Sequence, residues 1–345
     1  MRKVLVGMSG GVDSSTVAAL LKKDGYEVYG VNLKFWECEE KSDDDAKKIC
    51  DFLSIPYYSG DYSALFKEKV ITPFINEYIN GRTPNPCVMC NPTAKVFALC
   101  DFADKLGIEY IATGHYAKIY RDGEKTYLMQ GENLKKDQSY FLYALKKEQL
   151  KRLLFPIGGY TKEEVRKIAE DFGIEVSKKP DSQEICFLPD GEIGKFIKEY
   201  GRNVPPEGYF VDTEGNPIGI HKGIYNYTIG QRKGLGAFGK PYFVRGLDAK
   251  NNTVTIGDDI LSKELITENF AFTGDFECDF PFTAKVKIRS RAPMADALIE
   301  KCSEGIKIIF DTPQRAVTPG QSAVLYKEGK VLGGGIIKCT NGQIQ

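Results

Sequence analysis

Histidine, a frequent partner of cysteine in zinc sites, is scarce in this chain: His115 and His221 are the only two in 345 residues. An excess of charge of either sign is also missing, because 47 basic and 47 acidic residues give a formal net charge of zero. No global field therefore favours an anionic membrane or a polyanion, and any contact with nucleic acid must use local basic patches.

Long apolar runs are absent as well. The chain starts Met1-Arg2-Lys3 and passes straight into a strand pattern without a cleavable apolar signal, and no run has the length that a bilayer requires. The nine cysteines are odd in number and scattered, which fits a reducing compartment better than a disulfide framework. We therefore expect a cytoplasmic protein that does not contact membranes.

The most informative segment is residues 3–23, KVLVGMSGGVDSSTVAALLKK. An apolar strand leads through Ser9-Gly10-Gly11 into a helix that begins near Ser14. The glycines let the backbone approach an anion, and the hydroxyls and the N–H groups of the helix start supply donors aligned with its dipole. The segment is neither GxxxxGK[ST] nor GxGxxG, yet it predicts a phosphate site. The alternative is a glycine-rich turn with no ligand.

Alternating strand and helix patterns predict an α/β fold, a doubly wound parallel sheet, over residues 1–198. The expected strands are 3–6, 27–33 and 110–113, and the expected helices are 14–23, 43–52, 93–106 and 161–172. Thr161 and Glu164 form a capping-box pattern at the start of the last helix.

After about residue 200 the pattern changes to short strands interrupted by Gly, Pro and Asn. Strands are expected at 208–211, 216–219, 242–248, 252–256, 282–289, 306–310, 322–326 and 330–337. We predict two small β domains, a central one over 199–265 and a barrel-like one over 266–345.

Cys87 and Cys90 lie three residues apart in TPNPCVMCN, between prolines and before the helix expected from Thr93. A following helix N-terminus favours the thiolate, so both sulfurs are candidates for a nucleophile or a metal ligand. Half of a structural zinc site is the alternative, although the chain has no second CxxC. Cys186, in SQEICF, is either reactive or an inert core thiol. The other cysteines lie in helix or strand patterns and are interpreted as structural.

Together these segments resemble the tRNA-specific 2-thiouridylases, a family of the ATP pyrophosphatase superfamily that carries the SGGVDS signature. The resemblance covers nearly the whole chain. It rests on GMSGGVDSS at 7–15, NPCVMCN at 85–91, ATGHYAK at 112–118, KDQSYFLY at 136–143, SQEICF at 182–187, YTIGQRKGLG at 227–236 and TPGQSAVLY at 318–326. The last two segments are far more particular to the family than the phosphate loop.

The resemblance implies a role for each matching position. For ATP it implies Gly7, Met8, Ser9, Gly10, Gly11, Val12, Asp13 and Ser14 at the phosphates, with Leu33 and Gly114 near the nucleoside. For tRNA it implies Asn85, Pro86 and Cys87 at the target base, and His115, Lys136, Asp137, Gln138, Arg289, Ser290 and Gln321 at further contacts. For sulfur transfer it implies Cys90 as the nucleophile and Cys186 as the carrier of a persulfide. Leu33 stands where the family usually has methionine.

Several of these residues also have plain structural interpretations. His115 can pack beside a sheet edge, and residues 136–138 can form a polar helix entry. Lys285, Lys287, Arg289 and Arg291 alternate along one strand, which gives either a ridge suited to phosphates or a solvated face. Arg232 and Lys233, between glycines in GQRKGLG, suit either a hairpin or a loop that contacts an RNA backbone.

The implied reaction is ATP-dependent replacement of O2 of the wobble uridine by sulfur, in tRNAs for Lys, Glu and Gln. Adenylation of O2 releases pyrophosphate and makes AMP the leaving group, with Mg²⁺ stabilising the developing charge and Asp13 placing either the metal or the loop. Sulfur then passes from Cys186, which an external cysteine desulfurase or sulfur-relay protein must load.

Cys87 departs from the family, since many members have an aspartate at this position. Cys87, Cys90 and Cys186 are therefore alternatively a ligand set for a [4Fe–4S] cluster with one open iron. Two other functions compete with thiolation. One is a different ATP pyrophosphatase, such as an amide-forming synthetase, which needs no reactive cysteine. The other is a noncatalytic RNA-binding adapter that senses ATP.

Overall fold

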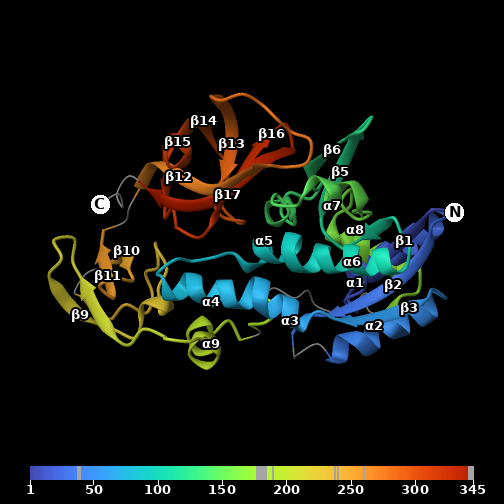
Figure 1. The fold of residues 1–345 in the computed structure, drawn as a ribbon, viewed down its shortest axis with the longest axis horizontal. Coiled ribbons are helices and arrows are strands. Elements are labelled where there is room, and N and C mark those ends of the chain that lie inside the picture. Colours follow the sequence, from blue (N-terminus) through green and yellow to red (C-terminus); the bar gives the residue numbers. More distant parts are fainter. Residues whose placement is uncertain are drawn as a thin grey trace.

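The computed structural model describes residues 1–36, 40–175, 185–188, 190–236, 238, 241–258 and 261–340. Figure 1 shows an elongated molecule with a sheet and its helices at one end, a small sheet at the other and a barrel above the helices that join them. The predicted fold class, a doubly wound parallel sheet followed by small β domains, is confirmed. No helix in the described part of the chain is long and apolar enough to cross a membrane.

The N-terminal sheet has five parallel strands in the order β3-β2-β1-β4-β7. Its strands are β1 (Lys3–Gly7), β2 (Glu27–Lys34), β3 (Tyr57–Asp61), β4 (Tyr110–Ala112) and β7 (Leu153–Leu154). The order reverses between β1 and β4, because the chain adds β2 and β3 on one side of β1 and then β4 and β7 on the other. Loops that follow β1 and β4 therefore meet at the carboxyl edge of the sheet, where doubly wound folds bind ligands.

Both faces of this sheet are covered, so its central strand is a continuous apolar run. Val4 and Val6 face a core shared with helices α1 (Val12–Lys23), α2 (Glu40–Phe52) and α8 (Lys162–Asp171). Leu5 faces the opposite core, which contains helices α4 (Thr72–Ile79) and α6 (Val96–Lys105). This alternation follows from the two-residue period of a strand.

Two long helical rods cross the middle of the molecule (Figure 1). In the first, α3 (Ser63–Phe66) continues through a π turn (Lys67–Ile71) into α4; in the second, α5 (Pro86–Cys90) continues through a π turn (Asn91–Lys95) into α6. The second rod starts seven residues before the helix expected from Thr93. Asn85 caps it by accepting a hydrogen bond from the Cys87 amide at 3.2 Å, and Pro86 is favourable in the first turn.

The central domain is a four-stranded sheet in the order β10-β11-β8-β9. Its strands are β8 (Gly208–Val211), β9 (Pro217–His221), β10 (Phe243–Asp248) and β11 (Thr253–Gly257). A core of its own surrounds Phe210, Val244 and Ile256. Helix α9 (Ile193–Tyr200) precedes this domain and packs its buried face, Phe196 and Ile197, on the N-terminal core.

The C-terminal domain is a closed antiparallel barrel. Its order β12-β15-β14-β13-β16-β17 closes through pairing of β12 with β17. The strands are β12 (Leu261–Phe272), β13 (Phe282–Lys287), β14 (Ala295–Cys302), β15 (Gly305–Arg315), β16 (Ser322–Lys327) and β17 (Lys330–Thr340). Sequence patterns gave no prediction for β14, whose polar and apolar residues do not alternate regularly.

A hairpin from the N-terminal domain extends the barrel sheet. Strands β5 (Ala117–Asp122) and β6 (Lys125–Gln130) follow β4, and Met129 of β6 pairs with Lys330 of β17. The Lys330 ammonium lies over the rings of Tyr120 and Tyr127, 5.7 and 4.9 Å from their centroids. The sequence analysis assigned no strand to this hairpin.

Candidate active site

The loop after β1 has the geometry of an anion cradle. Gly10 is buried and has a φ of 67°, a conformation that glycine adopts without strain. The Ser14 hydroxyl donates to the Gly11 carbonyl and accepts a hydrogen bond from the Ser9 amide, both at 3.2 Å. Gly11 precedes the first turn of α1 and gives it no side-chain cap. The first N–H groups of α1 therefore remain available to a bound anion.

Gly114 follows β4 and lies directly against this loop, at the point where the strand order reverses. A Cβ atom at Gly114 would lie 2.9 Å from the Asp13 Cβ and 3.1 Å from the Ser14 amide nitrogen. The sheet thus brings two segments about a hundred residues apart into contact, both predicted to bind ATP. Their glycines have no side chains, so the backbone of both segments can approach a ligand closely. This region therefore fits a nucleoside triphosphate.

Asp13 is held by two residues from other elements. Its carboxylate accepts hydrogen bonds from the Lys162 ammonium at 2.7 and 2.9 Å and from the Tyr116 hydroxyl at 2.8 Å. The Lys162 ammonium also lies 5.8 Å from the centroid of the Tyr116 ring. Among the two alternatives for Asp13, this geometry supports positioning of the loop, because Mg²⁺ at this carboxylate must compete with Lys162.

Sequence analysis missed Lys162, because its burial and its partner both depend on how α8 packs on α1. The predicted capping box of Thr161 and Glu164 is confirmed and fixes where α8 begins. Lys162 is the first residue of that helix, and only 6% of it is exposed. A buried lysine needs an anionic partner, and Asp13 of the phosphate loop is that partner.

The side of the phosphate loop that faces β2 is apolar. Leu33 lies near the end of β2 and is buried, as is Met8. The Met8 amide donates to the Val31 carbonyl at 2.8 Å, and its carbonyl accepts a hydrogen bond from the Asn32 side chain at 3.0 Å. These contacts hold the first residues of the phosphate loop against β2, where the resemblance places the nucleoside.

The predicted cysteine pair lies at the start of the second helical rod. Cys87 is in the first turn and exposed, whereas Cys90, one turn further, is buried with 9% of it exposed. The helix start was expected to lower the pKa of these thiols. Instead, the protein atoms around the Cys87 sulfur raise the pKa of that thiol despite its access to solvent, and the charge of Lys95 opposes this shift only partly.

Lys95 follows the cysteine turn on the second rod, and its charge acts on two of the predicted site residues. Its positive charge acts on the Cys87 thiol and also on His115, the residue after Gly114. Burial lowers the pKa of His115 to about 3, and Lys95 adds to this effect. The His115 Nδ1 atom is 2.8 Å from the Thr113 hydroxyl, and the ring packs edge-on against Phe155. His115 is therefore neutral at physiological pH.

The same rod continues from Lys95 to the phosphate loop. The methyl groups of Leu99 in α6 lie 3.3 Å from the position of a Cβ at Gly7. Cys90 and Leu99 are separated by nine residues, or roughly 14 Å of helix. The rod thus places the cysteine pair and the phosphate loop along one edge of the sheet.

Cys186 is exposed and directly precedes Phe187, which anchors it. The Phe187 ring packs edge-on against Phe74 of α4 and Phe66 of α3, with centroids 5.2 and 5.8 Å apart. Phe187 belongs to the same buried core as Cys90, and α5 packs on the π turn between α3 and α4. Residues 182–184 of this motif, and Cys38, lie outside the described residues.

The three thiols do not form a ligand set for a metal cluster. Within the described residues, which include Cys87, Cys90 and Cys186, no three His, Cys, Asp or Glu side chains are arranged to hold a metal ion. In this arrangement the residues do not fit an iron–sulfur cluster.

Two residues expected at the RNA, Asp137 and Gln138, have strong contacts within the protein. The buried Asp137 carboxylate accepts hydrogen bonds from the Gly131 and Ser139 amides and from the Ser139 hydroxyl, at 3.0, 3.1 and 2.9 Å. Gln138 pairs with both backbone groups of Tyr116 at 2.9 Å. Their neighbour Lys136 is exposed. This segment therefore lies beside His115.

Arg289 and Gln321 lie where the three domains meet. Arg289 donates to the Ile229 and Ala316 carbonyls at 3.1 Å and to the Thr318 hydroxyl, and burial lowers the pKa of its guanidinium. Gln321 donates to the Thr83 carbonyl at 2.8 Å. Thr83 also contacts the Thr228 hydroxyl at 3.1 Å. The junction thus fixes the chain two residues before Asn85, while Ser290 remains partly exposed.

Models of three protein families match successive parts of the chain. They are described as the tRNA methyl transferase HUP domain (residues 2–190), the tRNA methyl transferase PRC-barrel domain (194–258) and the aminomethyltransferase beta-barrel domain (262–337). The fold and the phosphate loop thus define a HUP-domain protein with two appended β domains.

Full-length relatives narrow this class. The chain is 48% identical to tRNA-specific 2-thiouridylase MnmA of Acetivibrio thermocellus, covering 98% of this chain and 99% of the relative. It is 46% identical to the protein of the same name in Clostridioides difficile, with 98% of each chain covered. The chain belongs to the tRNA-specific 2-thiouridylase family. A solved 4-thiouridine synthetase–RNA complex with bound ATP is 18% identical over 57% of this chain and 50% of its own, with a TM-score of 0.36.

Proposed function

We propose that this protein is a tRNA-uridine 2-sulfurtransferase that uses ATP to thiolate C2 of the wobble uridine. Full-length similarity to named 2-thiouridylases supports the substrate. One structural observation carries the mechanism: the second helical rod runs from Cys87 and Cys90 through Lys95 to Leu99, which packs against the phosphate loop at Gly7. A thiol centre and an ATP site are thus combined along one sheet edge.

Adenylation makes the uridine reactive. Attack of O2 on the α-phosphorus of ATP forms the O2–P bond and expels pyrophosphate, whose charge the first N–H groups of α1 stabilise. Gly114 leaves room for the nucleotide beside Asp13 and Ser14. Mg²⁺ carried by the ATP phosphates would supply further charge neutralisation. The base must leave the stack of the anticodon loop to enter this site.

Sulfur transfer uses the two cysteines that the resemblance identifies. Cys186 carries a persulfide, loaded by an external cysteine desulfurase or sulfur-relay protein, and its exposure suits that exchange. The Cys90 thiolate attacks the Cys186 sulfur and releases the outer sulfur as sulfide, which replaces AMP at C2. The two thiols lose two electrons and form a disulfide, and an external dithiol reduces it again.

Neutral His115 and protonated Cys87 border this reaction. Because the pKa of His115 is low, the imidazole can accept a hydrogen bond from the tRNA or from water at neutral pH without carrying charge. The raised pKa of Cys87 keeps its thiol protonated, so Cys87 donates a weak hydrogen bond where many relatives have a carboxylate. The substrates expected are the tRNAs for Lys, Glu and Gln, in the cytoplasm.

The decisive experiment separates adenylation from sulfur transfer. Cys186→Ser should retain tRNA-dependent formation of pyrophosphate and AMP but yield no 2-thiouridine, whereas Cys278→Ser in the barrel should leave both unchanged. Unaltered thiouridine in Cys186→Ser would overturn the sulfur route. If pyrophosphate forms without tRNA and Cys90→Ser is fully active, an amide-forming synthetase is the better explanation; no turnover with any tRNA would favour an adapter.

A sulfur route through an iron–sulfur cluster is tested by measuring iron and acid-labile sulfide rather than activity. We expect anaerobically purified protein to contain no stoichiometric iron or acid-labile sulfide, and Cys87→Asp to support thiolation. About four irons per chain, lost in Cys87→Ser, would contradict the persulfide route and assign Cys87 to a cluster.

A further inference from the structure

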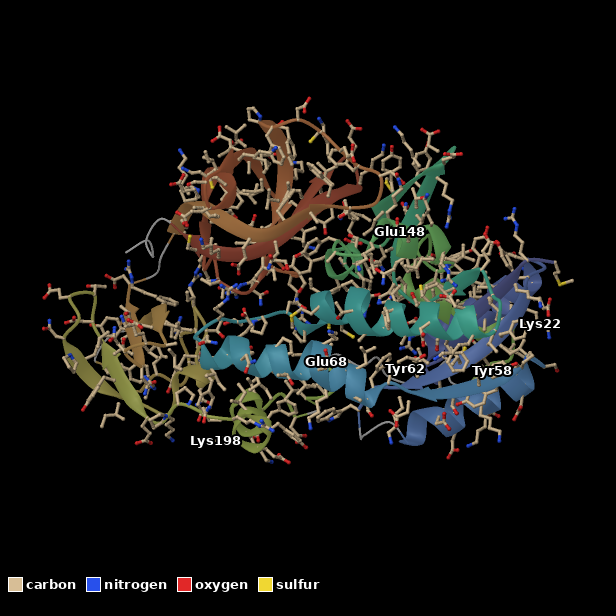
Figure 2. All side chains as sticks on the ribbon, viewed as in Figure 1. Lys22, Tyr58, Tyr62, Glu68, Glu148 and Lys198 are labelled. Atoms are coloured by element: carbon tan, nitrogen blue, oxygen red, sulfur yellow. The ribbon has the colours of Figure 1, made fainter. Side chains whose placement is uncertain are left out.

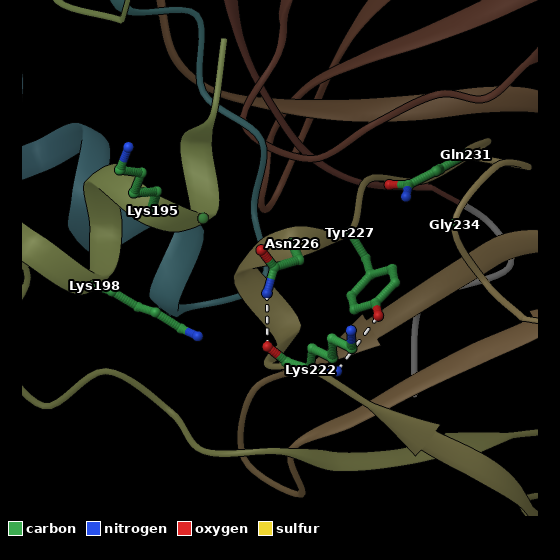
Figure 3. Close-up of a pocket in the computed structure, with 8 residues that line it drawn as sticks. Lys195, Lys198, Lys222, Asn226, Tyr227, Gln231 and Gly234 are labelled. Atoms are coloured by element: carbon green, nitrogen blue, oxygen red, sulfur yellow. Dashed lines mark hydrogen bonds between the residues drawn. The ribbon is translucent and has the colours of Figure 1, made fainter. Parts of the chain in front are cut away.

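A basic cavity lies far along the molecule from the phosphate loop, between α9 and the central domain. Its volume is about 560 Å³, and its lining is Gly194, Lys195, Lys198, Lys222, Asn226, Tyr227, Gln231 and Gly234. Lys198 extends from α9 toward the turn that carries Asn226, and the Lys222 side chain, from the loop after β9, runs beside Tyr227 (Figure 3). We call these eight residues the basic pocket.

The charges of the basic pocket are not neutralised within the protein. Among the described residues, neither Lys198 nor Lys222 has an ion-pair partner, and both are exposed. Lys195 has only a long contact with Glu192, at 3.8 Å. Arg232 and Lys233, two exposed residues of the GQRKGLG loop, lie in sequence between the lining residues Gln231 and Gly234. Three lysines thus line a cavity that has no lining carboxylate, and two further basic residues lie next to lining residues in sequence.

Contacts between the domains hold these lysines in place. The Asn226 side chain donates to the Lys222 carbonyl at 2.7 Å and to the Gly223 carbonyl at 3.2 Å. A Cβ at Gly194 would lie 1.9 Å from the Asn226 Oδ1 atom, so glycine is required for α9 to approach this turn. Lys198 and Lys222 are therefore carried by elements that touch each other, not by independent loops.

The basic pocket connects directly to the proposed target-base segment. Its lining residue Tyr227 is followed by Thr228, whose hydroxyl is 3.1 Å from that of Thr83. Cys87 lies four positions after Thr83 along the chain, a span of at most roughly 14 Å. The Thr83–Thr228 contact therefore joins the segment that carries the cysteines to the turn that carries the basic pocket; Figure 2 shows Lys198 at the lower edge of the molecule.

We propose that the basic pocket binds backbone phosphates of the RNA substrate, away from the reacting base. This inference rests on the proposed function. The polar side chains are long exposed lysines and amides around an open hollow, which suits a sugar–phosphate backbone; a small-molecule site encloses its ligand. Such contacts add affinity that is independent of sequence and sensitive to salt.

The test compares two double variants that remove equal charge. Lys198→Gln/Lys222→Gln should weaken binding of unmodified tRNA roughly tenfold near 100 mM salt, and lower the slope of log K against log salt by about 1 to 2. KM for tRNA should rise while kcat at saturating tRNA stays unchanged. The control is Lys23→Gln/Lys47→Gln, on the exposed sides of α1 and α2, and it should match the wild type.

Unchanged tRNA affinity and salt slope in Lys198→Gln/Lys222→Gln would overturn the proposal. So would a loss confined to binding of inorganic phosphate or AMP, because the pocket would then be a small-anion site. Failure of the proposed function is a separate result: wild-type protein would make no thiouridine, while binding of tRNA would still depend on these two lysines. Melting temperatures equal to that of the wild type verify that the exposed substitutions leave the fold intact.

Discussion

Lys162 on α8 donates hydrogen bonds to both carboxylate oxygens of Asp13 in the phosphate loop, although 149 residues separate them in sequence. Asp13 places a negative charge where an ATP phosphate is expected. Lys162 neutralises that charge and orients the first turn of α1. Removing one partner of a buried pair leaves an uncompensated charge, which costs several kcal/mol in general and less here because Asp13 is 32% exposed.

Lys162→Met is therefore expected to raise KM for ATP and to lower the free energy of unfolding by roughly 2 kcal/mol. The double variant Asp13→Asn/Lys162→Met should lose less stability than the sum of the losses in the two single variants, because removing both charges leaves no unpaired charge. The measurement is a double-mutant cycle on urea unfolding and on pyrophosphate formation. If the effects of the two substitutions add, on unfolding and on pyrophosphate formation alike, the Asp13–Lys162 contact contributes to neither stability nor catalysis.

Gly114→Ala tests the contact between β4 and the phosphate loop. The new methyl group would lie 2.9 Å from the Asp13 Cβ, so the loop must move. We expect ATP affinity to fall at least tenfold and the free energy of unfolding to decrease by roughly 1–3 kcal/mol. Gly159→Ala is the matched control, because a Cβ there meets no atom within 4 Å. Equal ATP affinity in both variants would contradict the proposed place of the nucleotide.

His115 makes stability depend on pH. Its folded-state pKa is about 3, below the ordinary value of 6.5, so the unfolded chain binds a proton that the folded chain excludes. Stability from this residue is present above pH 6.5 and is lost as pH falls toward 3, by roughly 1–2 kcal/mol at pH 5. His115→Gln should flatten that part of the curve. NMR can follow both histidines; titration of His115 near pH 6.5 would refute this.

Substitution of Arg289 tests whether this residue stabilises the domain junction or contacts RNA directly. Its guanidinium donates to three acceptors across the domain junction, and its Nε atom is buried without a hydrogen-bond partner. Arg289→Met should lower the free energy of unfolding by roughly 1–3 kcal/mol, since it removes the donor to the Ile229 carbonyl and to the Thr318 hydroxyl, while the Ala316 carbonyl keeps its hydrogen bond from Thr318. The neighbouring exposed Arg291→Met should change stability little. A stable Arg289→Met protein with weakened tRNA binding would instead favour a direct RNA contact.

Periodicity was sufficient to predict β1, β2 and β4 of the N-terminal sheet, because these strands and the helices beside them have clear two- and 3.6-residue patterns. No strand order was predicted from the sequence. Strand patterns also missed β3, β7, which has only two residues, and the β5–β6 hairpin, whose exposed polar residues do not alternate cleanly. The second rod began earlier than expected because Asn85 and Pro86, read as a rigid turn, form its cap.

Motifs identified the components of the site but not the contacts among them. Glycines and hydroxyls predicted the phosphate loop directly from local backbone requirements. Lys162 was invisible to that logic, since its partner Asp13 is set by the packing of α8 on α1. Similarly, Asp137 and Arg289 are polar in sequence, and only the three-dimensional structure shows that their acceptors and donors are other parts of the protein.

The pairing of Met129 with Lys330 has a consequence for how the chain is made. A ribosome releases the β5–β6 hairpin about 200 residues before its partner strand, a delay of roughly 10 to 40 s at ordinary rates of synthesis. During that time the outer backbone of β6 is open to other strands. Truncation before the barrel would make this exposure permanent, so the N-terminal domain produced alone should aggregate although its own sheet is complete.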